Sequence, residues 1–224
     1  VPWRPRDMAK AIGLVIGGTL ALSVPTVVIA AAIAGGSDFE DDPAALSLVL
    51  GSSLFLEVFL LVSAVLFSVR KYGVPWSALG LRWPQRGGPL LPLGLVIIGL
   101  VIVYTYFLAL SAFGVKPNAD IPEEAFHNVG PLAVLAVLSL GFAPIMEEIF
   151  FRGFIFGGLR GRWGTLPAAL AAGFLFGLAH LGNPGTIYVF VPVGLVGAVF
   201  ALGYAYSGSL LSAMVAHFLF NLVS

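Results

Sequence analysis

The stretch FAPIMEEIFFRG, residues 142–153, places Glu147, Glu148 and Arg152 within otherwise apolar sequence. Glu148 and Arg152 are four residues apart with the acid first, which is the favourable order for an ion pair on one helix face. Glu147 is rotated by about 100° from Glu148 and cannot share that pairing equally. We therefore expect Arg152 to hold Glu148 and Glu147 to face a cavity, where a carboxylate can act as a general base.

Two histidines lie in other apolar stretches. His180 is in FLFGLAHLG with Phe176 one helical turn before it, and His217 is in LSAMVAHFLFN with Asn221 one turn after it. At 1.5 Å of rise per residue, Glu147 and His180 lie about 20 Å from the inner ends of their helices. His217 and Asn221 lie about 12–18 Å along theirs. The hairpin geometry therefore predicts that these polar groups meet at a similar depth.

The composition indicates that lipid is the solvent for most of the chain. Of the 224 residues, 59% are hydrophobic and only 10% are charged, whereas soluble domains carry about 25% charged residues. The net charge is zero and no face is basic, which argues against a nucleic-acid partner. The absence of cysteine excludes a thiol nucleophile, cysteine metal ligands and disulfides.

The apolar residues form segments of about the length that a membrane-spanning helix needs. The segments cover roughly residues 11–34, 46–69, 89–113, 131–159, 166–182, 186–206 and 209–223. They predict an all-α, polytopic transmembrane bundle of about seven spans, with residues 1–224 forming a single integral-membrane domain. The first segment is too long for the core of a signal peptide, so we expect it to be retained as a span.

The charges between these segments predict an orientation, because lysine and arginine favour the cytoplasmic side. Basic residues precede the first segment and lie between the second and third and between the fourth and fifth: Arg4, Arg6, Lys10, Arg70, Lys71, Arg82, Arg86, Arg160 and Arg162. The other loops, GGSDFEDDP and KPNADIPEEAFHN, are acidic. We expect a cell-membrane protein with a cytoplasmic N-terminus, and the Ala-, Gly- and Val-rich composition favours a prokaryotic source.

Three motifs resemble a known family. EEIFFR, FGLAH and HFLFN match, in order, the EExxxR, FxxxH and HxxxN signatures of the CAAX-protease and bacteriocin-processing family, which includes Rce1-type prenyl-protein proteases. The resemblance covers about residues 130–224, while the first three spans are generic. It implies an intramembrane endopeptidase that acts on a peptide or membrane-protein substrate.

The resemblance also implies a role for each motif residue. Glu147 is similar to the catalytic glutamate that activates water together with His180. His217 and Asn221 are similar to the pair that stabilises the oxyanion of the tetrahedral intermediate. The supporting residues are Glu148 and Arg152.

A zinc-dependent version of the same protease is open. Its ligands would be Glu147 or Glu148 with His180 and His217, since two histidines and a glutamate form an acceptable catalytic zinc shell. We favour the version without a cofactor, because the family uses a glutamate mechanism and because a zinc site would not require Asn221 as a donor.

Two further functional classes are open: a non-catalytic bacteriocin-immunity or scaffold protein, and a proton-coupled carrier, for which no internal repeat is found. Glu57, in LFLEVFLL, is expected to pair with Arg152 or a serine, or else to belong to the site. Ser209 is expected to cap a helix rather than to act as a nucleophile. Small residues in the sixth span predict close helix packing; they are Gly194, Gly197 and Ala198.

Overall fold

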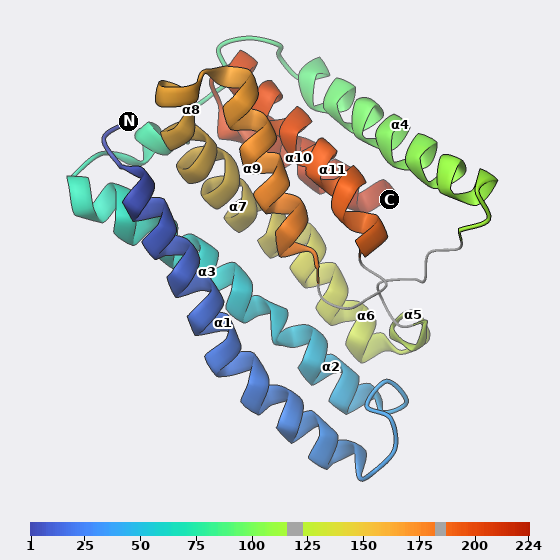
Figure 1. The fold of residues 1–224 in the computed structure, drawn as a ribbon. Helices are drawn as coiled ribbons and strands as arrows, with labels where there is room; N and C mark the ends of the chain where they lie inside the picture. The colour runs from blue at the N-terminus through green and yellow to red at the C-terminus, as the bar shows by residue number, and fades with distance from the viewer. Residues whose placement is uncertain (116–122, 182–186) are drawn as a thin grey trace.

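The computed structural model describes residues 1–115, 123–181 and 187–224, and these residues form helices with no strand among them (Figure 1). In chain order the elements are α1 (Pro5–Ala34), α2 (Pro43–Gly51), α3 (Ser53–Val65), η1 (Leu66–Arg70), η2 (Trp76–Leu79), α4 (Leu90–Ala112), α5 (Glu124–His127), α6 (Val129–Ala136), η3 (Val137–Phe142), α7 (Ala143–Glu147), η4 (Glu148–Phe156), α8 (Gly157–Trp163), α9 (Thr165–Ala179), α10 (Ile187–Ser207) and α11 (Leu210–Val223). The predicted all-α membrane bundle is confirmed. Elements η1, η3 and η4 are π-helical, and η2 is a 3₁₀ turn.

All seven predicted segments contain helices, although the helix of the fifth segment ends at Ala179, before the predicted end, and a turn at Ser52 interrupts the second segment. Residues 182 and 186, at segment ends, lie outside the described part. Within residues 1–115, 123–181 and 187–224, five helical stretches are long and apolar enough to cross a membrane: Pro5–Ala34, Pro43–Arg70, Leu90–Ala112, Val129–Trp163 and Ile187–Ser207. The other two, α9 and α11, have 15 and 14 residues. At about 1.5 Å per residue they are shorter than the roughly 30 Å of a bilayer core.

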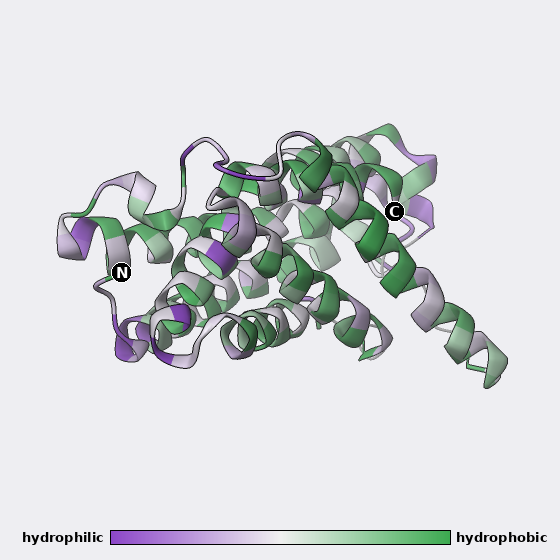
Figure 2. Cartoon of the chain, turned by 90° about the horizontal axis from the view of Figure 1, so that it is seen from above, coloured by the Kyte–Doolittle hydropathy of each residue, from purple (hydrophilic) through white to green (hydrophobic). Residues whose placement is uncertain are grey.

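The outside of the bundle is apolar. Figure 2 shows the helices mostly in green, with much of the purple near the two ends of the bundle. Large apolar side chains point outward from the long helices, including Val28, which is 65% exposed, and Leu108, which is 73% exposed. In water such a surface would be costly, whereas in lipid it needs no polar cover. The chain is an integral membrane protein.

Helices α9 and α10 approach each other closely through glycines. A Cβ added at Gly173 would lie 2.4 Å from the carbonyl oxygen of Gly194, and one at Gly177 would lie 2.5 Å from that of Phe190. The predicted close packing of the sixth span is therefore confirmed, and its partner is α9. Small residues drive such packing in membranes because they let backbones come together.

The N-terminal segment is fastened to the rod that carries the EExxxR motif. The indole Nε1 of Trp3 donates to the carbonyl of Phe154 at 2.8 Å. The buried carboxylate of Asp7 accepts from the Tyr72 hydroxyl at 2.6 Å and forms an ion pair with Lys71. These contacts hold the ends of α1 and η1 against each other and anchor the start of the chain on η4.

Candidate active site

Glu148 lies at the centre of a buried ionic cluster. Its Oε1 is 2.8 Å from Nη1 of Arg152 and 2.9 Å from Nδ1 of His217. The three side chains are at most 6% exposed. The predicted Glu148–Arg152 ion pair is present, although Nη1 makes a close charge contact rather than an aligned hydrogen bond. A carboxylate between a guanidinium and an imidazole fixes the orientation of the imidazole.

The guanidinium of Arg152 has further partners on neighbouring helices. Nη2 donates to the carbonyl of Gly197 at 3.3 Å, and the absence of a side chain there brings the α10 backbone near. The guanidinium carbon lies 4.2 Å from the ring centre of Phe176 and 5.6 Å from that of Phe200. Cation–π contacts of this kind help to offset the loss of water around a buried cation.

Glu147 faces the other side of the same imidazole. It ends α7, is 7% exposed, and places Oε2 3.7 Å from Nε2 of His217. The two adjacent acids thus point in different directions, as the rotation of about 100° per residue predicts. Glu148 contacts Nδ1 of His217 and Glu147 faces Nε2.

His180 lies just beyond the end of α9, not inside the fifth span as predicted, because the helix ends at Ala179. Its backbone N–H donates to the carbonyl of Gly177 in a tighter turn. The carbonyl of Phe176 is therefore free to accept a hydrogen bond from the imidazole ring of His180. Nδ1 lies 2.8 Å from that carbonyl and donates to it, since a carbonyl oxygen only accepts. In the neutral imidazole, Nε2 is then an acceptor.

The ring of Phe176 connects the two histidines. Its centre lies 4.7 Å from that of His180 and 5.9 Å from that of His217. Phe176 packs beside the site and also stacks on Arg152. Its ring and its carbonyl therefore both help to place polar groups of the other motifs.

Asn221 lies one turn after His217 on α11 and bonds to a different element. Its Nδ2 donates to the carbonyl of Ser139 at 2.8 Å, in the π-helical segment η3. An amide nitrogen carries two N–H groups, and this bond uses one of them. The bond orients the amide without occupying all of its donors.

Direct contacts thus join four of the six predicted residues: Glu147, Glu148, Arg152 and His217. His180 reaches this cluster through ring packing, and Asn221 through its own helix. The assignment of chemical roles to these residues, and the convergence of Glu147 and His180 on one water, stay predictions.

Glu57 has a different neighbour from the expected one. It lies on α3, is 6% exposed, and its carboxyl group lies beside that of Glu147. Within the described part of the chain, Glu57 forms no ion pair with Arg152 and no hydrogen bond with a serine, so the expected pairing is wrong. An acid in the middle of an apolar span was the only signal in the sequence, and it did not identify a partner on a helix so distant in the chain.

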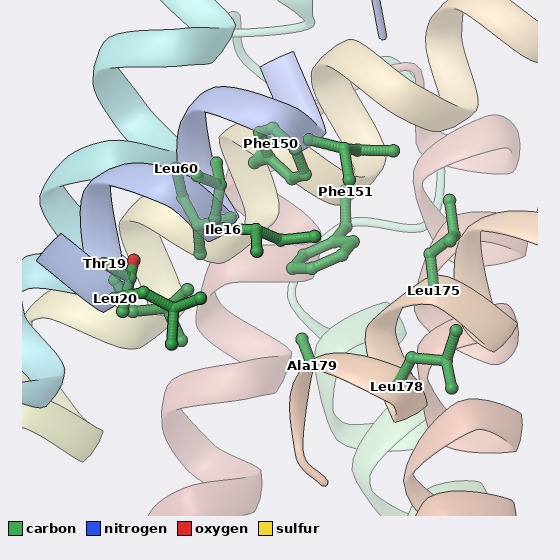
Figure 3. A pocket seen from close by; sticks show the side chains of 12 residues that line it. Ile16, Thr19, Leu20, Leu60, Phe150, Phe151, Leu175, Leu178 and Ala179 are labelled. Atoms are coloured by element: carbon green, nitrogen blue, oxygen red, sulfur yellow. The ribbon is translucent and has the colours of Figure 1, made fainter. Parts of the chain in front are cut away.

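An apolar cavity of about 380 Å³ lies beside the cluster, between α1, α3, η4 and α9 (Figure 3). Of the side chains that line it, Thr19 alone is polar, and none of the six predicted residues is among them. Phe151 forms part of the wall and packs edge-on against Phe176, with ring centres 5.2 Å apart. Aromatic rings therefore separate the cavity from the ionic cluster.

A catalytic zinc ion needs three protein ligands close together. Within the described part of the chain, no three His, Asp or Glu side chains are grouped so that they could hold a metal ion. Glu147 and His217 face each other, but His180 is not in direct contact with them. The residues as placed do not form the three-ligand shell of a catalytic zinc site.

Comparison with known proteins gives one match. Residues 129–223 match the Rce1-like family, described as type II CAAX prenyl endopeptidase Rce1-like. Neither the curated proteins nor the solved structures contain a match. The matched region contains all three motifs and supports intramembrane endopeptidase activity in general. The resemblance carried by those motifs is thus confirmed for residues 129–223, which are similar to the Rce1-like family of CAAX prenyl endopeptidases.

Proposed function

We propose that this protein is an intramembrane endopeptidase that hydrolyses peptide bonds with water activated by Glu147. The observation that carries the proposal is the buried contact chain Glu147–His217–Glu148–Arg152, within the region that matches the protease family. Four ionisable side chains buried together in a membrane protein are expensive, and such groups mark functional sites.

The chemistry starts with a water beside Glu147. The carboxylate takes one proton as the oxygen attacks the carbonyl carbon of the scissile bond. Nε2 of His180, an acceptor because Nδ1 donates to Phe176, holds the same water. The proton on Glu147 then passes to the leaving amine as the C–N bond breaks. The products are one carboxyl group and one amine, so the water is fully accounted for.

The tetrahedral intermediate carries a negative oxygen that needs donors. Asn221 supplies the N–H that its bond to Ser139 leaves unused. His217, whose Nδ1–H donates to Glu148, supplies the second donor through Nε2 as an imidazolium cation. Loss of one such donor commonly costs about 2.7–4 kcal/mol of transition-state stabilisation.

The substrate is a peptide or a membrane protein that reaches the site from the cytoplasmic side or laterally from the bilayer. The positive-inside rule places the N-terminus in the cytoplasm, and composition favours a prokaryotic source. The description of the matched family names a CAAX prenyl endopeptidase, so a farnesylated CAAX peptide is one suitable probe. Unmodified peptides are the other, because a prokaryotic source favours peptide maturation or membrane-protein turnover.

The test measures cleavage of a quenched-fluorescence peptide library and of a farnesylated CAAX peptide by the purified protein in detergent. Glu147→Gln is expected to abolish cleavage while the melting temperature and monodispersity stay near wild type. The control Glu123→Gln makes the same exchange at an acid whose side chain is 87% exposed, and should cleave normally.

Substitutions of the other three residues are expected to lower kcat with smaller effects on KM; they are His180→Ala, His217→Ala and Asn221→Ala. Wild-type cleavage by Glu147→Gln would overturn the proposal. If the wild type cleaves nothing while Glu147→Ala gives full protection in a bacteriocin-immunity assay, the non-catalytic class is correct instead.

A further inference from the structure

Glu57 is a buried acid outside the three motifs and outside the residues that match the family. It lies in the middle of the span Pro43–Arg70, where an ionised carboxyl is costly. None of the ion pairs formed by the described residues includes it. A polar group in this position either has no functional role or contributes to the candidate active site.

Among the described residues, the carboxyl group of Glu57 lies beside that of Glu147. Helix α3 packs against α7, and Oε2 of each acid is buried without a hydrogen-bond partner in the described part of the chain. Glu147 therefore lies between Glu57 on one side and His217, 3.7 Å away, on the other. Two carboxylates are acceptors only, so a hydrogen bond between them requires one proton.

We propose that Glu57 is a positioning residue: as a neutral carboxylic acid it donates a hydrogen bond to the Glu147 carboxylate and fixes its orientation toward the attacking water. This inference rests on the proposed function. If Glu57 is the donor, Glu147 stays ionised, as a general base must be. Like-charge repulsion between two buried carboxylates favours the same arrangement, in which only one is charged.

The proposal differs from a purely structural role in what an apolar replacement does. Removing one partner of a buried hydrogen bond leaves the other unsatisfied and destabilises the fold. Glu57→Leu should therefore lower the melting temperature modestly, and kcat should fall at a temperature where both proteins are fully folded. Misplacement of a reacting group by about 1 Å can cost roughly 100-fold in rate, so a loss of roughly 10-fold to 100-fold in kcat is expected, with KM little changed.

Glu57→Gln is the decisive partner variant. Its amide N–H is a permanent neutral donor to Glu147, so this variant should retain kcat within a factor of about three of the wild type, a difference that corresponds to about 0.65 kcal/mol. Ser63→Ala is the matched control on the same helix. Its buried hydroxyl donates only to carbonyls of its own helix, Phe59 and Leu60, and cleavage should be unchanged.

Kinetics are measured with the quenched-fluorescence peptide that the wild type cleaves fastest. Wild-type kcat in Glu57→Leu, or equal loss in Glu57→Leu and Glu57→Gln, would overturn the positioning role. Cleavage by Glu147→Gln would instead reject the proposed function itself. The infrared difference spectrum between wild type and Glu57→Gln can be measured without substrate. It should show that the variant has lost a protonated-carboxyl band. If no such band is lost, the shared proton is rejected.

Discussion

Nδ1 of His217 and Oε1 of Glu148 lie 2.9 Å apart, and this contact joins α11 to η4 across 69 positions of the chain. Arg152 approaches the same oxygen at 2.8 Å. One carboxylate thus neutralises a buried guanidinium and orients an imidazole. The same oxygen atom therefore contributes both to the stability of the fold and to the proposed activity, and mutations can distinguish the two contributions.

Arg152→Ala should destabilise the protein strongly, because it leaves Glu148 buried without its cation. Breaking a buried ion pair from one side typically costs about 3–5 kcal/mol. The double variant Glu148→Gln/Arg152→Met removes both charges and should recover much of the melting temperature, yet its kcat should stay low because His217 loses its carboxylate. Recovery of full activity in the double variant would contradict the orienting role of Glu148.

Phe176→Leu should lower kcat by roughly 10-fold without unfolding the protein, because even small misplacement of reacting groups is costly. The ring contacts His180, His217 and Arg152. Phe174→Leu is the control, since Phe174 lies on the same helix and is 54% exposed. Equal kcat in the two variants, measured by peptide cleavage at matched folding, would contradict the positioning of the histidines by Phe176.

Gly173→Ala should lower the melting temperature, because its Cβ would lie 2.4 Å from a backbone oxygen of α10 that cannot move alone. Gly17→Ala is the control. No atom lies within 4 Å of a Cβ placed there, so the exchange should be neutral or stabilising by up to about 1 kcal/mol from helix propensity. A melting temperature for Gly173→Ala at or above that of the control would mean that α9 and α10 are less tightly packed than the structure shows.

Exhaustive chelation should leave peptide cleavage intact if Glu147 acts directly on water. The purified protein should then contain no stoichiometric zinc by elemental analysis. Loss of activity on chelation, restored by zinc alone, would favour the alternative in which Glu147 or Glu148 acts with the histidines as ligands. Glu147→Gln is inactive under both mechanisms and so serves as the baseline for either outcome.

The orientation can be tested with single cysteines, because the chain has none of its own. Ser37 and Ser77 are both exposed and lie in connections on opposite sides of the predicted membrane. In intact cells a membrane-impermeant maleimide should label Ser37→Cys and should label Ser77→Cys only after lysis. The reverse pattern would place the N-terminus outside.

The sequence by itself determined the helices, the membrane setting and the local pairing of Glu148 with Arg152. These depend on residues near one another in the chain: apolar runs set the spans, and a spacing of four sets a shared helix face. The capping role of Ser209 was also local, and its hydroxyl accepts from the N–H of Leu211. The lengths of the helical hairpins predicted that the histidines and the acids lie at a similar depth in the membrane. They did not predict the directions in which the side chains point.

Only the tertiary structure decided which polar groups touch. Whether Glu57 meets Glu147, and which nitrogen of His217 faces which acid, depends on how each helix is rotated about its axis. That rotation is set by packing between helices distant in the chain, such as the glycine contacts of α9 with α10. The end of α9 at Ala179, which frees the Phe176 carbonyl for His180, likewise has no marker in the FGLAH motif.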